Sequence, residues 1–254
     1  MPAASSRRSS LPSSSHRPRK RFGQHFLHDP RVLERIVDSL SLAPSDFVVE
    51  IGPGQGALTR LLRGRCRHVE AIEIDRDLVA RLRQEGIDVR EGDALQLDYA
   101  AFPAGVRIVG NLPYNISTPL LFHLARTATH ARDMHFMLQL EVVERMLAAP
   151  SRAAYGRLSV ALQARFHMEK LFNVSKGAFR PPPKVESALV RLRPRAAPLE
   201  IDEALLRRAF SARRKTLRNA LPGVDLAAAG IDPGLRPENL SPEDYARLSM
   251  NSIL

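Results

Sequence analysis

The sequence predicts an α/β fold with a mostly parallel sheet, followed by a small all-helical domain. Short apolar runs alternate with stretches of helical periodicity as far as about residue 138, which is typical of parallel strands joined by helices on both faces of a sheet. After Pro194 apolar residues recur at helical spacing among many prolines and glycines. The length of 254 residues fits one large domain with a small addition.

The apolar runs place the individual elements. Five strands are expected, at 47–51, 69–74, 88–90, 106–110 and 134–138, with helices that end near residue 63 and that span 77–84 and 118–128. Because crossovers between parallel strands are right-handed, such strands form one sheet with both faces covered. In sheets of this kind a ligand binds at the carboxyl ends of the strands.

Composition divides the chain into three segments. Residues 1–21 hold seven Ser and six basic but no acidic side chains, so a disordered basic tail is expected. Residues 22–195 are predicted to form the α/β domain, and a linker from Pro194 to Pro198 leads to a helical domain at 199–254.

The helical domain is expected to begin with one amphipathic helix over 202–221. Its apolar face holds Leu206, Phe210, Leu217 and Leu221. Six basic residues and no acid lie between Ala204 and Leu221, so a basic stripe is predicted on the opposite face.

The formal net charge of +11 is unevenly distributed along the chain. It divides into +6 for 1–21, −3 for 22–150, +8 for 151–195 and zero for 196–254. This separation indicates a polyanionic partner, with nucleic acid the leading candidate, although a solvated basic surface is the alternative.

The cysteine, histidine and hydropathy patterns indicate which classes of site are not expected. The single Cys66 excludes an internal disulfide and a Cys-rich zinc site, and the eight histidines show no metal spacing. No uncharged apolar run approaches 18 residues, so no membrane span is expected. We therefore predict a cytoplasmic protein without a metal.

A glycine turn, Gly52-Pro53-Gly54-Gln55-Gly56, follows the first strand and opens a helix. Glycines there let a ligand approach the main chain, and Glu73, at the end of the next strand, can accept hydrogen bonds from ribose hydroxyls. Asp93, after the third strand, can accept from an adenine amine or cap the next segment. The pattern fits NAD and S-adenosylmethionine (SAM) about equally well.

A second motif, Asn111-Leu112-Pro113-Tyr114, follows the fourth strand, at the edge of the same crevice. The Asn111 side-chain oxygen and the Leu112 carbonyl can accept both hydrogens of an exocyclic adenine amine and aim its lone pair at an electrophilic methyl group. Pro113 stiffens the loop, and the Tyr114 ring can stack on a flipped base. The alternative is a proline turn with a packed tyrosine.

Several motifs of this sequence resemble those of the bacterial ribosomal RNA adenine dimethyltransferases. They are Gly23-Gln24-His25-Phe26-Leu27, Glu50 to Gly56, Glu73-Ile74-Asp75, Asn111 to Pro119, Tyr155 to Ser159 and Phe179 to Val185. The resemblance covers about Arg19 to the C-terminus and is strongest to the small-subunit members. The segment Phe210 to Asn219 also resembles these members rather than the antibiotic-resistance methylases.

This resemblance implies a Rossmann-like, SAM-dependent methyltransferase sheet of about seven strands with a small helical RNA-binding domain. It implies an enzyme that dimethylates two adjacent adenosines in the 3′-terminal hairpin of small-subunit (16S) rRNA, with SAM as methyl donor. The partner would be a maturing pre-30S particle, and the enzyme a monomer.

The resemblance also assigns residues to roles. Cofactor binding is implied for His25 (where many members carry Asn), Leu27, Gly52, Gly54, Glu73, Asp93 and Asn111. Catalysis is implied for Asn111, Leu112, Tyr114 and Phe179, whose ring would close on the other face of the target base. RNA contacts are expected from Arg157, Lys184, Arg207, Arg214, Lys215 and Arg218.

Other functions stay open at this point. They are a ribosome-assembly factor whose catalysis is secondary, a large-subunit rRNA methylase of the resistance type, and an NAD oxidoreductase that uses the same glycine turn.

Overall fold

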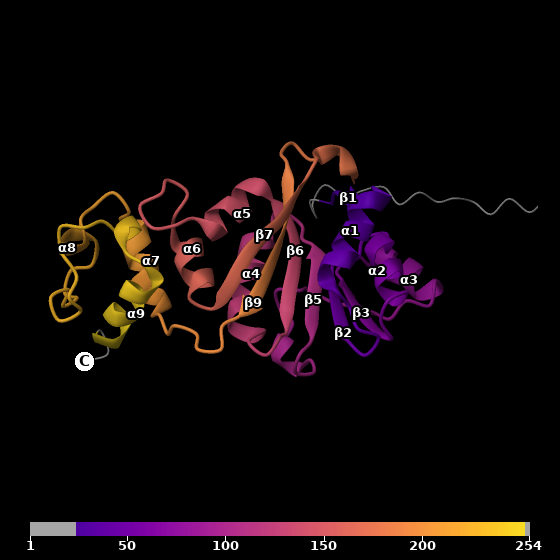
Figure 1. Ribbon diagram of the computed structural model, residues 1–254, viewed down its shortest axis with the longest axis horizontal. Coiled ribbons are helices and arrows are strands. Elements are labelled where there is room, and N and C mark those ends of the chain that lie inside the picture. The colour runs from indigo at the N-terminus through magenta and orange to yellow at the C-terminus, as the bar shows by residue number, and fades with distance from the viewer. Residues whose placement is uncertain (1–23, 252–254) are drawn as a thin grey trace, which may run out of the picture.

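A computed structural model of the protein describes residues 24–251, and the tail expected at 1–21 lies outside them. A sheet of seven strands forms the centre of the larger domain, in the order β4-β3-β2-β5-β6-β9-β7 (Figure 1). The strands are β2 (Phe47–Ile51), β3 (His68–Glu73), β4 (Val89–Glu91), β5 (Arg107–Asn111), β6 (Asp133–Gln139), β7 (Phe166–Val174) and β9 (Ser187–Pro194).

The predicted Rossmann-like, mostly parallel sheet is confirmed. Strands β4, β3, β2, β5 and β6 pair in parallel, and β9 runs antiparallel to both β6 and β7. The five strands expected from apolar runs all form, each within one residue of its predicted bounds. The antiparallel strands β7 and β9 were not predicted individually; in β7 exposed positions break the apolar pattern, whereas β9 is mostly buried.

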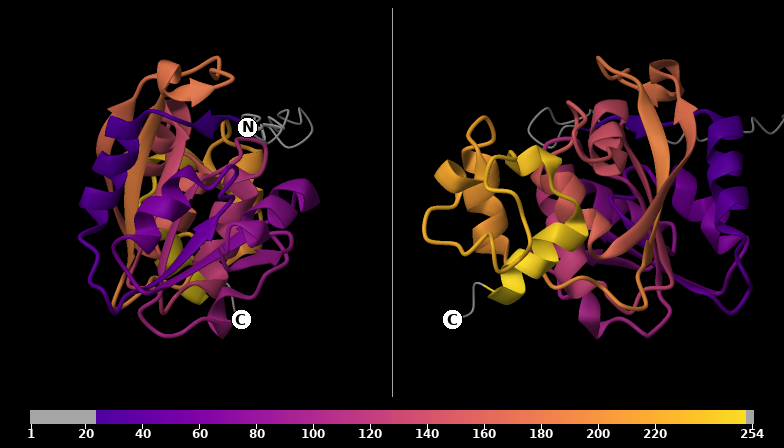
Figure 2. Two further views of the ribbon diagram at one scale, coloured as in Figure 1. Left: turned by 90° about the vertical axis from the view of Figure 1, so that its right-hand side faces the viewer. Right: turned by 60° about the vertical axis from the view of Figure 1, so that its left-hand side comes forward.

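Helices cover both faces of the sheet (Figure 2). One face packs against α1 (Pro30–Leu40), α2 (Ala57–Arg63) and α3 (Arg76–Gln84), and the other against α4 (Ser117–Thr127), α5 (Leu140–Leu147) and α6 (Arg157–Gln163). The Asp29 carboxylate caps α1 by accepting from the Arg31 amide at 2.9 Å. This cap fixes where the chain leaves a short strand, β1 (Phe26–Leu27), which pairs antiparallel with β8 (Phe179–Arg180).

Close packing of β2 against β5 brings the two predicted motifs together. A Cβ atom on Gly110 would lie 2.5 Å from the Ile51 carbonyl oxygen, so only glycine fits at this point. Asn111, at the end of β5, therefore lies beside Gly52, where the glycine turn starts.

The helix predicted over 202–221 is wrong in its extent. The chain forms α7 (Glu203–Ser211), then turns, and α8 covers only Leu217–Ala220. The amide of Leu217 donates to the Leu235 carbonyl at 2.7 Å, and that of Arg218 donates to the Pro233 carbonyl at 3.1 Å. Because these amides bond outside the helix, a continuous helix cannot form, although the four apolar residues still share one core cluster.

The helical part, which ends with α9 (Pro242–Asn251), packs on the α/β part through α6 (Figure 1). Leu158 and Leu162 of this helix belong to the core of the sheet, whereas Val160 belongs to the core of the helical part, together with Tyr155. The boundary between 195 and 199 stays a prediction, because α6 serves both cores.

Candidate active site

The glycine turn between β2 and α2 leaves room for a ligand against the main chain. Gly54 has a φ of +56°, and a Cβ atom there would lie 2.8 Å from the Phe26 ring. Side chains are therefore excluded from this position both by backbone conformation and by space. Phe26 of β1 forms one wall of the site.

Glu73 ends β3 next to this turn and is held in one orientation. Its Oε1 accepts from the amides of Ile74 and Asp75, both at 2.9 Å, and its Oε2 accepts from the Gly54 amide at 3.3 Å. Burial raises the pKa of Glu73, while these backbone amides lower it. The result is a fixed carboxylate at the carboxyl edge of the sheet, suited to accept hydrogen bonds from two ribose hydroxyls.

The amide of Asn111 is oriented by the segment that contains β1. Its Nδ2 donates to the His25 carbonyl at 2.8 Å, so its Oδ1 is the atom left to accept a hydrogen bond from an incoming amine. The Leu112 amide donates to the Met137 carbonyl at 3.2 Å, which anchors the loop. Asn111 Oδ1 is thus placed to accept, while the acceptor role of the Leu112 carbonyl stays a prediction.

Tyr114 lies at the open side of the loop and is half-buried. Its hydroxyl and the Ser187 Oγ are 2.7 Å apart, and its ring centroid is 5.3 Å from that of His25. A ring nitrogen of His25 in turn lies 2.8 Å from the Pro181 carbonyl oxygen. The Tyr114 ring is therefore supported from two sides.

One pocket brings most of the predicted residues together. It encloses about 60 Å³ between β1, the glycine turn and the Asn111 loop. Its walls include His25, Gly52, Gly54, Glu73, Asn111, Leu112 and Tyr114, together with Gln24, Phe26, Ile74 and Pro113.

A second pocket of about 240 Å³ adjoins the first and shares Gly52, Glu73, Ile74 and Pro113 with it. Asp93 lines this second pocket, and its Oδ1 caps the local turn by accepting from the Leu95 amide at 2.9 Å. The two roles considered for Asp93, a cap and a ligand for an adenine amine, can therefore coexist, one for each carboxylate oxygen.

Three wall residues were not singled out individually by sequence reasoning. Ile74 is 47% exposed although it is large and apolar, and it lines both pockets beside Glu73, so it offers a surface for an adenine ring. Phe26 and Gln24 enter the site through β1 and the residues before it. The isoleucine directly after the strand-end acid was the available sequence signal for Ile74.

Besides Asp93, two of the predicted cofactor-binding and catalytic residues, Leu27 and Phe179, lie outside the first pocket. Phe179 is only 1% exposed and packs in the core beneath α1, so its ring is not available to a base in this conformation. The β1–β8 pairing places it opposite Leu27, which is also mostly buried. The stacking role of Phe179 stays a prediction that requires movement of β8.

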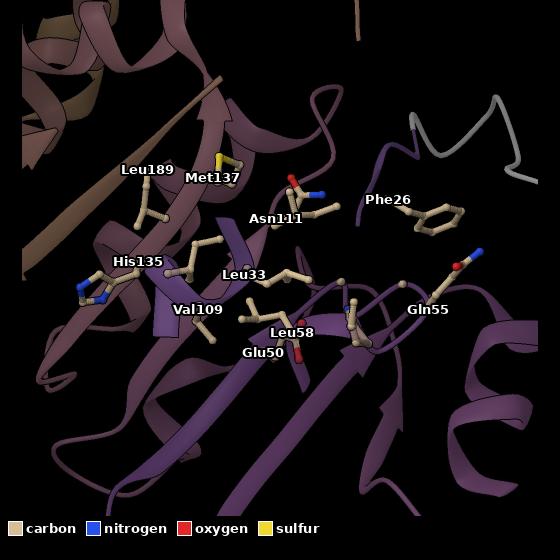
Figure 3. A pocket seen from close by; sticks show the side chains of 17 residues that line it. Phe26, Leu33, Glu50, Gln55, Leu58, Val109, Asn111, His135, Met137 and Leu189 are labelled. Carbon is tan, nitrogen blue, oxygen red and sulfur yellow. The ribbon is translucent and has the colours of Figure 1, made fainter. Parts of the chain in front are cut away.

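A third pocket of about 40 Å³ lies behind the glycine turn and also reaches Asn111 (Figure 3). Leu27 lines it, as do two buried titratable groups, Glu50 and His135. Glu50, Val109 and His135 occupy adjacent register positions on β2, β5 and β6.

The six residues predicted to contact RNA are all exposed. Arg157 and Arg207 line a groove of about 360 Å³ between α4, α6 and α7, together with Arg126. The Arg157 guanidinium lies 4.5 Å from the centroid of the Phe122 ring, and Glu203 is the one acid in the groove wall. Of the other four, Lys184 lies in the proline loop after β8, and Arg214, Lys215 and Arg218 lie in the turn and short helix that follow α7.

The donor set of the joined pockets suits an organic nucleoside cofactor. A fixed carboxylate, an exposed isoleucine and a glycine cradle match a ribose, a base and a chain that passes close to the backbone. Within residues 24–251 no group of three or more His, Cys, Asp or Glu is arranged to hold a metal ion. No helix in the described range is long and apolar enough to cross a membrane.

A family model and curated relatives match most of the chain. A family model described as "Ribosomal RNA adenine dimethylase" matches residues 15–252. A relative from Aromatoleum aromaticum, "Ribosomal RNA small subunit methyltransferase A", is 54% identical over an alignment of 250 positions that covers 93% of this chain and 94% of that protein.

Two solved structures resemble the chain over most of its length. A dimethyladenosine transferase from Plasmodium falciparum has a TM-score of 0.74 and 30% identity, and covers 88% of this chain and 96% of its own. The 23S rRNA methyltransferase ErmE has a TM-score of 0.63 and 30% identity, and covers 89% of this chain and 98% of its own.

Proposed function

Because the chain belongs to the ribosomal RNA adenine dimethylase family, we propose that it dimethylates adenosines of small-subunit rRNA with SAM as the methyl donor. It is an rRNA adenine dimethyltransferase. The choice of the small subunit is supported by the 54% identity to a small-subunit enzyme, against 30% to a large-subunit one. By the same comparison the NAD oxidoreductase, the pure assembly factor and the resistance-type methylase are not favoured.

One observation connects the fold with the proposed reaction. The Asn111 Nδ2 donates to the His25 carbonyl, so the Asn111 Oδ1 is the atom left to accept a hydrogen bond. Asn111 and Glu73 line the same pocket. An acceptor for an amine thus lies in one pocket with an acceptor for ribose hydroxyls.

The residues of this pocket have different roles in the proposed reaction. SAM, when bound, supplies an electrophilic methyl group. Glu73, Asp93, Gly52, Gly54, His25 and Leu27 would hold it.

Asn111 Oδ1 and the Leu112 carbonyl accept the two hydrogens of the target amine, which opposes delocalisation of its lone pair into the ring. Tyr114 supports the flipped base by stacking, worth about 1–3 kcal/mol. The nitrogen loses its proton to water after transfer, so positioning is the main catalytic effect.

Recognition of the RNA is proposed to use the groove between α4, α6 and α7. Three arginines against one glutamate give it the charge to hold phosphates, and Phe122 beneath Arg157 keeps that guanidinium in place. Lys184, Arg214, Lys215 and Arg218 would extend this contact as exposed cations.

Replacing both Arg157 and Arg207 by alanine is expected to weaken binding of small-subunit rRNA and to reduce the slope of log K against log salt by about two, one for each lost phosphate contact. Filter binding over a salt series measures both quantities. The matched control replaces Arg63 and Arg67, two exposed arginines at and after the end of α2 on the other side of the sheet. An equal change in both double variants would contradict a groove-specific contact.

The finer features remain part of the proposal. The substrate would be two adjacent adenosines in the 3′-terminal hairpin, presented by a pre-30S particle in the cytoplasm. The enzyme would act as a monomer. These statements rest on the family resemblance and on the localised basic surfaces.

Reverse transcription across the 3′ end of small-subunit rRNA tests the function directly. Dimethylated adenine cannot form a normal Watson–Crick pair, so extension stops in RNA from the parent strain. In a strain without this protein we expect read-through, and we expect incubation of its 30S subunits with purified protein and SAM to restore the stop. A stop that persists in the deletion strain would reject the proposed substrate.

A further inference from the structure

Ser187 is a buried serine of the central sheet whose side chain reaches the Asn111 loop. It is the first residue of β9 and is fully buried. Its Oγ lies 2.7 Å from the Tyr114 hydroxyl, and either group can donate. Strands flank Ser187 on both sides, with Gln139 of β6 and Val174 of β7 as its partners in register. Ser187 is therefore a fixed point of the sheet, to which the tip of the Tyr114 side chain is tied.

Tyr114 itself lies in the loop between β5 and α4 and is half-buried. Its main-chain carbonyl accepts from the Ser117 Oγ at 3.1 Å, which holds the start of the side chain. The His25 ring contacts one side of the tyrosine ring, and the bond to Ser187 holds the far end. Because a tyrosine side chain has only two rotatable angles, holding both of its ends sets the plane of the ring.

The target amine is chemically different in the two methyl transfers. In each transfer the amine nitrogen forms a bond to the methyl carbon while the bond from that carbon to sulfur breaks and leaves its electron pair on sulfur. The nitrogen then loses one proton to water. A primary amine offers two hydrogens to the Asn111 Oδ1 and the Leu112 carbonyl, but a methylated amine has only one left. The ring contact with Tyr114 therefore has to supply more of the positioning in the second transfer.

We propose that Ser187 is a positioning residue for the second methyl transfer and that it acts through the Tyr114 hydroxyl. The inference rests on the proposed function, since it requires the target base to stack on Tyr114. Ser187 lines neither pocket of the proposed cofactor site. Its effect is therefore expected in the completion of dimethylation and not in the affinity for the cofactor.

The test replaces Ser187 with alanine in the full chain and follows both products on 30S subunits from a strain without this protein. At saturating SAM the rRNA is digested to nucleosides, and N6-methyladenosine and N6,N6-dimethyladenosine are quantified over time by mass spectrometry. Loss of one hydrogen bond typically costs roughly two- to tenfold. We expect the second transfer to slow by about fivefold and the first by less than about twofold. N6-methyladenosine should therefore accumulate in the variant.

A second variant removes the same hydrogen bond from the other side. Tyr114→Phe keeps the ring and deletes the hydroxyl, so it is expected to accumulate N6-methyladenosine to the same extent as Ser187→Ala. The double variant is expected to show no further change, because the two side chains act as one unit. Tyr114→Phe also tests the proposal by itself if Ser187→Ala does not fold.

Two control variants make the same chemical changes elsewhere in the fold. Tyr155→Phe removes a buried tyrosine hydroxyl that donates to the Leu240 carbonyl at 2.8 Å in the core of the helical part. Ser39→Ala removes a serine hydroxyl that donates to the Ile36 carbonyl at 2.6 Å in α1. Both are expected to keep the wild-type ratio of the two products, whatever their melting temperatures. Titration with S-adenosylhomocysteine is expected to give the wild-type Kd for Ser187→Ala.

The outcomes separate this inference from the proposed function. If the wild-type chain methylates no adenosine of small-subunit rRNA, the proposed function fails. If wild type is active and Ser187→Ala slows both transfers equally, or neither, the positioning role of Ser187 is overturned while the proposed function stands. Additive effects of the two single changes, or weaker binding of S-adenosylhomocysteine that accounts for the slower transfer, would overturn it as well.

Discussion

Replacing Asn111 with alanine is expected to lower the rate of rRNA dimethylation by about 100- to 1,000-fold, the cost typical of losing one oriented polar group at a reacting centre. Oδ1 of Asn111 is left to accept from the target amine because Nδ2 is held by the His25 carbonyl at 2.8 Å. Alanine removes this acceptor, so the lone pair of the amine stays delocalised in the ring.

Cofactor affinity is expected to change much less in the same variant. Loss of the bond to His25 loosens the segment before β1, and one hydrogen bond of this kind is worth about 0.5–1.5 kcal/mol, or roughly two- to tenfold in Kd. Single-turnover methylation of 30S subunits and titration with S-adenosylhomocysteine measure the two effects separately.

Asn173→Ala is the matched control for Asn111, since it removes an exposed asparagine on β7 that lines neither pocket of the proposed cofactor site. It is expected to leave both the rate and the affinity unchanged. Full activity of Asn111→Ala, or a loss of activity explained entirely by weaker cofactor binding, would contradict the acceptor role.

The sequence predicts the central part of this fold well, because parallel strands buried on both faces are nearly continuous apolar runs. The glycine turn, Glu73 and Asn111 could be placed together on the same reasoning, since each follows a strand and the carboxyl ends of parallel strands share one edge. The structure brings Gly52, Glu73 and Asn111 into one pocket as expected.

The features that sequence reasoning missed depend on long-range contacts. The helix expected over 202–221 has suitable periodicity, but its amides at Leu217 and Arg218 bond to a segment near residue 234. Phe179 is in a motif that suggests base stacking, yet β1–β8 pairing directs its ring into the core. Glu50 appears in sequence as part of the glycine motif, but the sequence does not show that it is buried with its Oε2 lacking a hydrogen-bond partner among the described residues.

The buried guanidinium of Arg107 contributes to the stability of the folded state. Arg107 lies at the opposite end of β5 from Asn111. Its side chain is 3% exposed, and its Nε and Nη2 donate to the two Asp133 carboxylate oxygens at 2.9 and 2.7 Å. Nη1 donates to Asp46 at 3.0 Å. One guanidinium therefore pairs with two acids where β2, β5 and β6 begin.

Replacing Arg107 with methionine is expected to lower the free energy of unfolding by about 3–5 kcal/mol, because Asp133 and Asp46 keep their charges without this partner. For a domain of this size the melting temperature should fall by roughly 6 to 20 °C. Arg132→Ala is the matched control, since this arginine also contacts Asp46, at 3.3 Å, but is 58% exposed. It is expected to cost at most about 1 kcal/mol.

Wild type and Arg107→Met are expected to differ in the free energy of unfolding. The pH dependence of this difference identifies its electrostatic part. Burial opposes ionisation of Asp46, but the Ala43 amide and Arg107 outweigh it and lower the pKa of Asp46 below its ordinary value of 3.8. A lowered pKa of a carboxyl stabilises the folded state at higher pH, and this stabilisation is lost as the pH falls through the folded-state pKa. The gap in unfolding free energy should therefore be largest near neutral pH and should narrow below about pH 4. A gap that is constant over this range would indicate that Arg107 acts through packing of its apolar stem rather than through its charge.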